Sequence, residues 1–227
     1  MNRPHEAPHG PALTAGFFAR DTATVARDLL GKVLVSRAGD TVTGGRIVET
    51  EAYLGSHDPG SHAATKGVTA RNVVMYGPPG RAYVYFTYGN HHMLNLVTEP
   101  EGTAGAVLIR ALEPTIGTDE MLRRRAQSVR ATRTVRALSP KDVANGPGKL
   151  AAALDVDLRD NGTELGMGRL VVYDAPSPIE AVGCSGRVGL SHGHELDLRF
   201  FLEENSHVST GRTGPVRPRS RRERGTT

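Results

Sequence analysis

The sequence predicts a single α+β domain around a mixed or antiparallel sheet. Its 227 residues, 38% of them hydrophobic, can bury one sizeable core, whereas two full domains would be cramped. Short segments rich in β-branched and aromatic residues dominate, and the helical segments are few and lie apart from them. The sequence contains no internal repeat.

The domain is predicted to span residues 14–204 and to begin with a helix. Before it, residues 1–13 form a polar lead that contains three prolines and is expected to be flexible. Apolar residues then recur at helical spacing; Asp21 or Thr22 can cap the start of this helix, and Gly31 stops it.

Two strands are predicted next, at residues 32–37 and 46–53, around a turn that contains glycine and aspartate. Four residues of the second strand fall on one face by its two-residue period: Ile47, Glu49, Glu51 and Tyr53. The carboxylate of Glu51 and the ring of Tyr53 can therefore line one cavity. A long, glycine-rich loop, residues 55–80, follows.

A β-hairpin is predicted from residues 82–87 and 91–97. They flank Gly89-Asn90, which suits a tight reversal because both residues tolerate positive φ, and Tyr88 lies at the tip. Further along, an apolar strand is predicted at 106–111 and a helix around 118–125. Pro147 suits the first turn of a helix that runs to residue 154. Three later strands are predicted at 170–173, 187–190 and 199–202.

The net charge of +4 arises in the C-terminal tail, residues 205–227. This tail has six arginines and one glutamate, so the rest of the chain carries about one negative charge. Its Gly, Pro, Ser and Arg content indicates disorder, and it either attracts nucleic acid or solubilises the chain. Inside the domain, a second cationic segment either faces phosphates or forms a solvated helix face: Arg123, Arg124, Arg125, Arg130, Arg133, Arg136 and Lys141.

The compartment is expected to be the cytoplasm, with nucleoid association in a prokaryote. Cys184 is the single cysteine, which excludes an internal disulfide and a multi-cysteine zinc site. The polar start is unlike a signal peptide, and no apolar run approaches the length of a membrane span.

Carboxylates and flat aromatic rings are concentrated together in a chain that has no tryptophan and only 5% aromatic residues. The stretch Glu49-Thr50-Glu51-Ala52-Tyr53 is followed by His62 and then by Tyr83, Tyr85 and Tyr88. Rings can hold a nucleobase, and a fixed carboxylate can activate water that cleaves a base from its sugar.

Several segments, in this order, resemble those of the alkyladenine (3-methyladenine) DNA glycosylase family. They are residues 46–53 (RIVETEAY), 83–85 (YVY) leading to Tyr88-Gly89, Leu94-Asn95, 107–114 (VLIRALEP), Gly146-Pro147-x-Lys149-Leu150 and Arg187-Val188-Gly189. The similarity runs from about Phe17 to Phe201. It implies a single domain with a curved, mostly antiparallel sheet, flanking helices and a projecting hairpin.

The resemblance implies a role for each matching residue. Glu51 corresponds to the catalytic base, with Glu49 as its local competitor, and Arg110 with the backbone carbonyl of Val188 corresponds to the groups that help to hold the attacking water. The base-binding residues correspond to Tyr53, His62 and Tyr85, and Asn95 to the asparagine that crowds the amino group of guanine.

Two further assignments concern DNA outside the pocket. Tyr88 resembles the tyrosine that fills the space left by a flipped nucleotide. After it, Asn90-His91-His92 replaces the bulkier residues of vertebrate enzymes, which leaves the insertion geometry open. Gly146 and Lys149 lie where a helix start offers free N–H groups, either as a seat for a DNA phosphate or as an ordinary capped helix.

Together these features predict a monofunctional DNA glycosylase for base excision repair, which flips alkylated or deaminated purines from double-stranded DNA and hydrolyses the N-glycosidic bond. It is expected to work as a monomer, with no cofactor, no metal and no membrane partner. Two alternatives stay open: a non-catalytic nucleic-acid-binding protein with a tyrosine stacking platform, and a hydrolase of free nucleosides.

Overall fold

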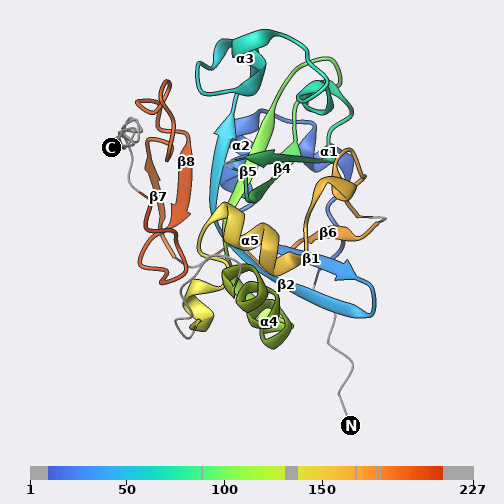
Figure 1. The fold of residues 1–227 in the computed structure, drawn as a ribbon. Helices are drawn as coiled ribbons and strands as arrows, with labels where there is room; N and C mark the ends of the chain where they lie inside the picture. The colour runs from blue at the N-terminus through green and yellow to red at the C-terminus, as the bar shows by residue number, and fades with distance from the viewer. Residues whose placement is uncertain are drawn as a thin grey trace, which may run out of the picture.

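The computed structural model describes residues 10–87, 89–130, 138–166, 168–176, 178 and 180–211. Their strands form one sheet in the order β3-β4-β5-β2-β1-β6, and β8 pairs with both β2 and β7. All of these pairings are antiparallel, which confirms the predicted α+β class with a mostly antiparallel sheet (Figure 1). The strands are β1 Val33–Ala38, β2 Thr41–Tyr53, β3 Ala82–Thr87, β4 His91–Val97, β5 Ala106–Ile116, β6 Leu170–Tyr173, β7 Val182–Ser185 and β8 Arg199–Leu202.

Helices surround this sheet. In Figure 1, α5 lies in front of it and α2 lies behind, and α2 packs against β2 and β5. The α helices are α1 Ala15–Phe18, α2 Thr22–Asp28, α3 His62–Lys66, α4 Thr118–Arg130 and α5 Pro147–Leu154. The described part of the chain also contains short 3-10 helices: η1 Gly55–His57, η2 Val73–Tyr76, η3 Pro140–Asp142 and η4 Leu158–Asp160. Within the described residues, no helix is long and apolar enough to cross a membrane.

The long strand β2 organises the sheet. One edge pairs with β5 along most of its length, and the other edge pairs with β1 through residues 41–46 and with β8 through residues 49–51. A register shift between Ile47 and Glu49 marks a bulge at the point where β2 changes partners. Residues 49–51 therefore have a strand on either side and lie in the interior of the molecule.

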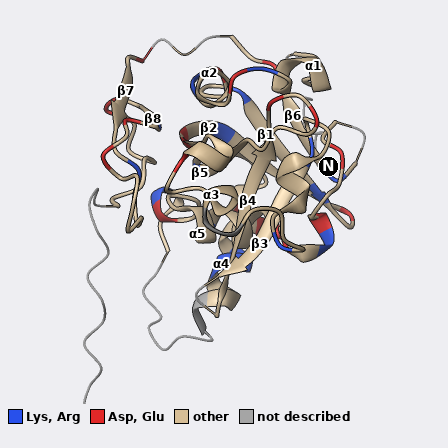
Figure 2. Ribbon diagram, turned by 90° about the horizontal axis from the view of Figure 1, so that it is seen from above, with Lys and Arg blue, Asp and Glu red and all other residues tan. Residues whose placement is uncertain are grey.

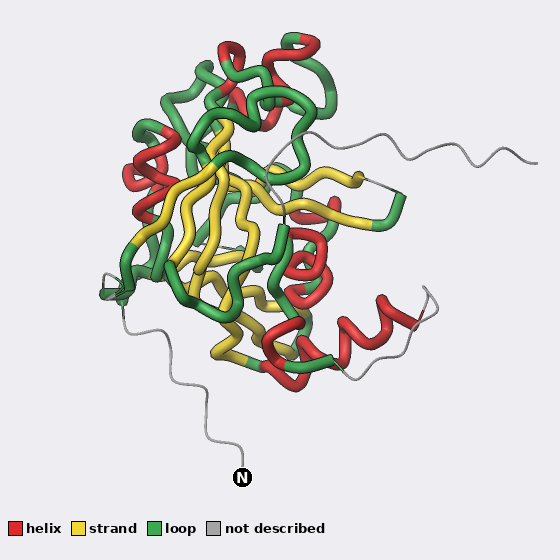
Figure 3. The backbone as a smooth tube through the Cα atoms, turned by 90° about the vertical axis from the view of Figure 1, so that its left-hand side faces the viewer, coloured by secondary structure: helices red, strands yellow, loops and turns green. Residues whose placement is uncertain are grey.

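Local sequence signals fix several elements. The side chain of Asp21 accepts a hydrogen bond from the N–H of Thr24 and caps α2, as predicted. Strands β3 and β4 have the predicted bounds, and Gly89 has a φ of 73°, so the turn takes the conformation that glycine permits. This hairpin projects from the body on the side that carries α4 and α5 (Figure 3).

Two predictions about elements were wrong. Residues 187–190 were predicted as a strand, but the strand in this region is β7, which ends at Ser185. The side chain of Arg187 forms a buried ion pair with Asp58, and Gly189 has a φ of 76°, far from the extended values of a regular strand. The segment 55–80, predicted as a loop, contains η1, α3 and η2, and its His62 is the first residue of α3.

Candidate active site

Strand β2 places Glu49 and Glu51 in the interior, where both side chains are 0% exposed. Each of these residues has β5 on one side and β8 on the other. Two buried carboxylates on one strand need cationic partners, because an unpaired buried charge is strongly destabilising.

Arg110 of β5 reaches both carboxylates. Its Nε lies 2.8 Å from Oε1 of Glu49, and its Nη1 lies 3.1 Å from Oε1 of Glu51. Burial alone would lower the pKa of Arg110, but the charges of Glu51 and Glu49 outweigh it and raise the pKa. Arg110 is therefore a fixed cation between the two glutamates.

Two further donors orient Glu51. The backbone N–H of Val188 donates to Oε1 at 2.7 Å, and the hydroxyl of Tyr53 donates to Oε2 at 2.9 Å. Burial, followed by the negative charge of Glu51, raises the pKa of Tyr53 well above 10, so its hydroxyl stays protonated and can donate. Val188 contacts Glu51 through its backbone N–H. That its backbone carbonyl helps to hold the attacking water stays a prediction.

Glu49 is held even more extensively. Its Oε1 accepts hydrogen bonds from Nε of Arg199 at 2.7 Å and from Oγ of Ser209 at 2.9 Å, and its Oε2 accepts one from the N–H of Ser209 at 2.7 Å. Burial raises the pKa of Glu49, but Arg110, Arg199 and the Ser209 N–H together bring it below its ordinary value. Glu49 thus anchors Arg110 and leaves Glu51 as the carboxylate beside the aromatic rings.

Neither Arg199 nor Ser209 was predicted as a site residue. Ser209 lies in the segment that the sequence assigned to the tail, and residues 205–211 of that segment are described. Gly211 packs so closely that a Cβ there would lie 2.5 Å from Cγ1 of Val188 and 3.3 Å from Nη2 of Arg110. The one sequence signal for the contact between Arg199 and Glu49 was a charged residue at the start of an apolar strand.

An aromatic pocket opens beside Glu51. Its empty volume is about 350 Å³ when the space at its open mouth is included. Tyr53 belongs both to the pocket wall and, through its hydroxyl, to the Glu51 cluster. The lining residues are Tyr53, Gly60, His62, Met75, Tyr83, Tyr85, Asn95, Ala106 and Leu190.

His62, Tyr83 and Tyr85 form one wall of this pocket. The rings of His62 and Tyr85 meet edge to face at 4.7 Å, and Nδ1 of His62 lies 2.9 Å from the hydroxyl of Tyr83. Burial raises the pKa of Tyr83 to about 12 and lowers the pKa of His62, with Arg71 adding to the latter shift. When Nδ1 of a neutral imidazole is hydrogen-bonded to Tyr83, its Nε2 can form a hydrogen bond with another group.

Two arginines support the tyrosine rings. The guanidinium of Arg187 lies 4.8 Å from the ring centre of Tyr53 and makes a two-point ion pair with Asp58, at 2.5 and 2.6 Å. Arg71 lies 5.0 Å from the ring centre of Tyr85. Neither contact was predicted.

Asn95 lies in the pocket wall, and its side chain is buried. Its Nδ2 donates to the carbonyl of Tyr83 at 3.0 Å, across the hairpin. That bond fixes the side-chain amide against β3 and gives the pocket wall a defined shape.

The predicted DNA-contacting residues lie elsewhere. Gly146 is the N-cap residue of α5, and no side chain makes a capping hydrogen bond to this end of the helix. Nζ of Lys149 donates to Oδ1 of Asn145 at 2.7 Å. Tyr88 lies outside the described residues, as do Arg133 and Arg136.

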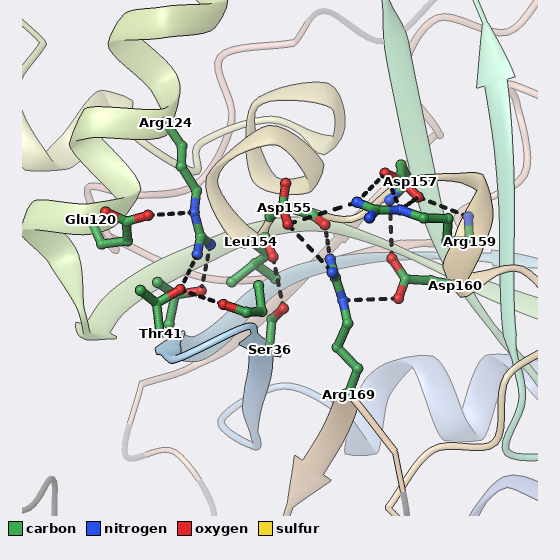
Figure 4. Close-up of polar contacts among 12 residues, drawn as sticks. Ser36, Thr41, Glu120, Arg124, Leu154, Asp155, Asp157, Arg159, Asp160 and Arg169 are labelled. Carbon is green, nitrogen blue, oxygen red and sulfur yellow. Dashed lines mark hydrogen bonds and ion pairs between the residues drawn. The ribbon is translucent and has the colours of Figure 1, made fainter.

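The arginines of α4 (blue in Figure 2) separate into different environments. Arg123 is exposed and pairs with Glu120 at 2.6 Å. Arg124 donates to Glu120 of the same helix at 2.9 Å and to Thr41 of β2 at 2.5 Å (Figure 4). Arg125 is buried. Arg123, Arg124 and Arg125 therefore form neither one solvated face nor one row that faces phosphates.

Comparison with known proteins identifies the relatives of the chain. The model of the family described as Methylpurine-DNA glycosylase (MPG) matches residues 16–206. A protein of Chlorobaculum parvum is 47% identical over 214 residues, which is 92% of this chain and 97% of that protein. One of Methanoculleus marisnigri is 45% identical, over 87% of this chain and 98% of that protein. Both bear the name "Putative 3-methyladenine DNA glycosylase".

Proposed function

The chain belongs to the methylpurine-DNA glycosylase family and is a DNA glycosylase of DNA repair; from that premise we propose that it is monofunctional and acts on alkylated or deaminated purines. It flips the damaged nucleotide out of double-stranded DNA into the aromatic pocket. A water molecule activated by Glu51 then hydrolyses the N-glycosidic bond and leaves an abasic site.

The arrangement around Glu51 carries this proposal. The Val188 N–H donates to one carboxylate oxygen of Glu51 and the Tyr53 hydroxyl donates to the other, while Arg110 forms an ion pair with the carboxylate. Each oxygen of a carboxylate has two lone pairs, so Glu51 can still accept a proton from water. Because the side chain of Glu51 is fully buried, that water enters from the pocket. The negative carboxylate also stabilises the positive charge that develops on the sugar as the bond breaks.

The pocket suits a flat base. Tyr53 and Tyr85 offer ring faces for stacking, and Nε2 of His62 is the group we assign to donate a hydrogen bond to the base edge. Purines alkylated on a ring nitrogen are cationic, which strengthens their contact with electron-rich rings. Among the described residues no lysine lines this pocket, so water is the nucleophile and no Schiff base with a lysine forms.

The experiment that tests this function separates it from its alternatives. The protein is incubated with hypoxanthine in a duplex and with free inosine, and released base is measured by chromatography and mass spectrometry. We expect release from the duplex and none from the nucleoside. Release from inosine alone would indicate a nucleoside hydrolase. The same assay is run on duplexes that carry 3-methyladenine, 7-methylguanine, hypoxanthine or an etheno adduct. If the protein binds these duplexes but releases no base from any of them, it is a nucleic-acid-binding protein and not a glycosylase.

Asn95 is proposed to discriminate against guanine. Asn95→Ala opens space where the exocyclic amino group of guanine would lie, so release of normal guanine should rise relative to damaged adenine, by roughly tenfold or more. Single-turnover excision from paired duplexes measures the ratio. Met75→Leu, which replaces another wall residue at similar volume, is the control and should leave the ratio unchanged. An unchanged ratio in Asn95→Ala would place the selectivity elsewhere.

A further inference from the structure

Arg71 is an exposed arginine beside the aromatic wall of the pocket. It lies between α3 and η2, and its guanidinium lies 5.0 Å from the ring centre of Tyr85. Its Nη2 also donates to the carbonyl of Phe86 in β3 at 3.3 Å. These two contacts hold the guanidinium against the strand that carries Tyr85.

The cations beside the two stacking rings differ in their partners. Arg187 lies 4.8 Å from the ring centre of Tyr53 and is neutralised by both carboxylate oxygens of Asp58. Within the described part of the chain, by contrast, no carboxylate lies at ion-pair distance from Arg71. Arg71 therefore contributes a net positive charge to the Tyr85 side of the pocket, whereas Arg187 contributes none to the Tyr53 side.

The charge of Arg71 reaches the pocket wall. Burial lowers the pKa of His62, and the charge of Arg71 lowers it further. Burial raises the pKa of Tyr83 to about 12, and the charge of Arg71 opposes this rise. A base stacked on Tyr85 would lie within roughly 10 Å of the guanidinium, since stacked aromatic rings have centroids about 5 Å apart. Salt leaves charges coupled over about this distance.

We propose, on the basis of the function proposed above, that Arg71 is a specificity-determining residue that favours neutral damaged purines over cationic ones. Hypoxanthine and etheno adducts belong to the first class, and purines alkylated on a ring nitrogen belong to the second. An unpaired guanidinium at this distance repels a cationic base. The ring of Tyr85 also attracts a second cation less strongly, because its electrons already face Arg71.

The bond-breaking step favours the same class of base. The water oxygen bonds to C1′ of the sugar, a water proton passes to Glu51, and the electron pair of the C1′–N9 bond passes to the base. Hypoxanthine carries negative charge from this step until it takes up a proton from solvent, whereas 7-methylguanine leaves as a neutral molecule. A nearby cation stabilises the negative charge that develops on hypoxanthine and gives no such stabilisation to 7-methylguanine.

The experiment places a duplex with hypoxanthine and a duplex with 7-methylguanine in one reaction with limiting enzyme. The initial ratio of released bases then reports the ratio of kcat/KM, after spontaneous release in an enzyme-free sample is subtracted. Arg71→Gln removes the charge but keeps an N–H donor for the Phe86 carbonyl. We expect it to shift the ratio toward 7-methylguanine by roughly threefold to tenfold. Arg71→Lys, which keeps the charge, should stay near the parent ratio.

The matched control is Arg37→Gln, which removes one charge at the other end of the sheet. Arg37 is also exposed and also contacts a tyrosine, since its Nη2 donates to the hydroxyl of Tyr173 at 2.6 Å. It lies in β1 beside β6, whereas Tyr85 lies in β3 at the opposite end of the strand order. Its ratio of released bases should equal that of the parent.

Two results would overturn the proposal. An unchanged ratio in Arg71→Gln would show that the charge does not select between the two classes of base. Equal slowing on both duplexes, with weaker binding of a lesion-free duplex, would show that Arg71 meets a DNA phosphate instead. Partial unfolding does not mimic the expected shift, because the ratio is independent of the fraction of folded enzyme.

The same reaction separates this inference from the proposed function. If the parent releases neither base, the proposed function fails for these lesions. If the parent releases both bases and the ratio does not move in Arg71→Gln, only the role of Arg71 fails. If the parent releases only one of the two bases, that base must be hypoxanthine for the proposal to stand.

Discussion

Glu51→Gln is expected to abolish excision while lesion-bearing DNA still binds with near-parent affinity. The amide keeps the shape of the side chain, and it can turn its nitrogen toward the Tyr53 hydroxyl, which then accepts, while its oxygen still faces Arg110 and the Val188 N–H. The amide cannot take a proton from water, and it lacks the charge that stabilises the sugar cation. Loss of both effects should slow the single-turnover rate by about a thousandfold or more.

The neighbouring carboxylate provides the matched comparison. Glu49→Gln removes a glutamate from the same strand, but one that bonds Arg110, Arg199 and Ser209, whereas Glu51 bonds the pocket residue Tyr53. It should keep measurable excision. Full activity in Glu51→Gln, or complete loss in Glu49→Gln alone, would move the base to another residue.

Glu49→Ala should produce the largest loss of stability. The substitution leaves Arg110 and Arg199 buried with one anion fewer and removes three hydrogen-bond acceptor contacts to Arg199 and Ser209. Breaking a buried ion pair in this way costs about 3–5 kcal/mol, which lowers the melting temperature by on the order of 10 °C for a chain of this size. Calorimetry measures the shift. Glu113→Ala, whose carboxylate is 33% exposed and pairs with Arg46, is the control and should shift the melting temperature little.

The same network predicts a pH dependence of stability. The pKa of Glu49 is lower in the folded protein than its ordinary value of 4.5. Its contribution to stability is therefore complete above about pH 4.5 and is lost as the pH falls through the lower, folded value. The stability difference between the parent and Glu49→Gln should shrink as the pH is lowered from 7 through this range. A difference that is constant with pH would contradict an ionised Glu49.

Local signals made part of the fold predictable. The hairpin of β3 and β4 follows from a Gly-Asn turn between two alternating segments, and the start of α5 follows from Pro147. The strand predicted at 187–190 failed for a non-local reason, because Arg187 bonds Asp58, 129 residues away in the sequence. A sequence pattern contains no sign of such a partner.

The contacts of the site likewise include local ones that the sequence predicts and long-range ones that it does not. The contact between Glu51 and Tyr53 follows from the two-residue period of one strand. The contacts of Glu49 with Arg199 and Ser209 span 150 and 160 residues, and Ser209 lies in a stretch whose composition indicates a tail. Arg125 was visible as one charge in a cationic run, but only the fold separates it from Arg123 and Arg124, which have an acidic partner.

The central claim is that this chain releases damaged purines from duplex DNA by hydrolysis at Glu51. Single-turnover excision tests it most directly, with the parent and Glu51→Gln on duplexes that each carry one defined lesion: 3-methyladenine, 7-methylguanine, hypoxanthine or an etheno adduct. The account predicts that the parent releases at least one of these as free base and leaves an intact strand with an abasic site, and that Glu51→Gln releases none. No release by the parent from any of the four, or equal release by both proteins, would contradict it.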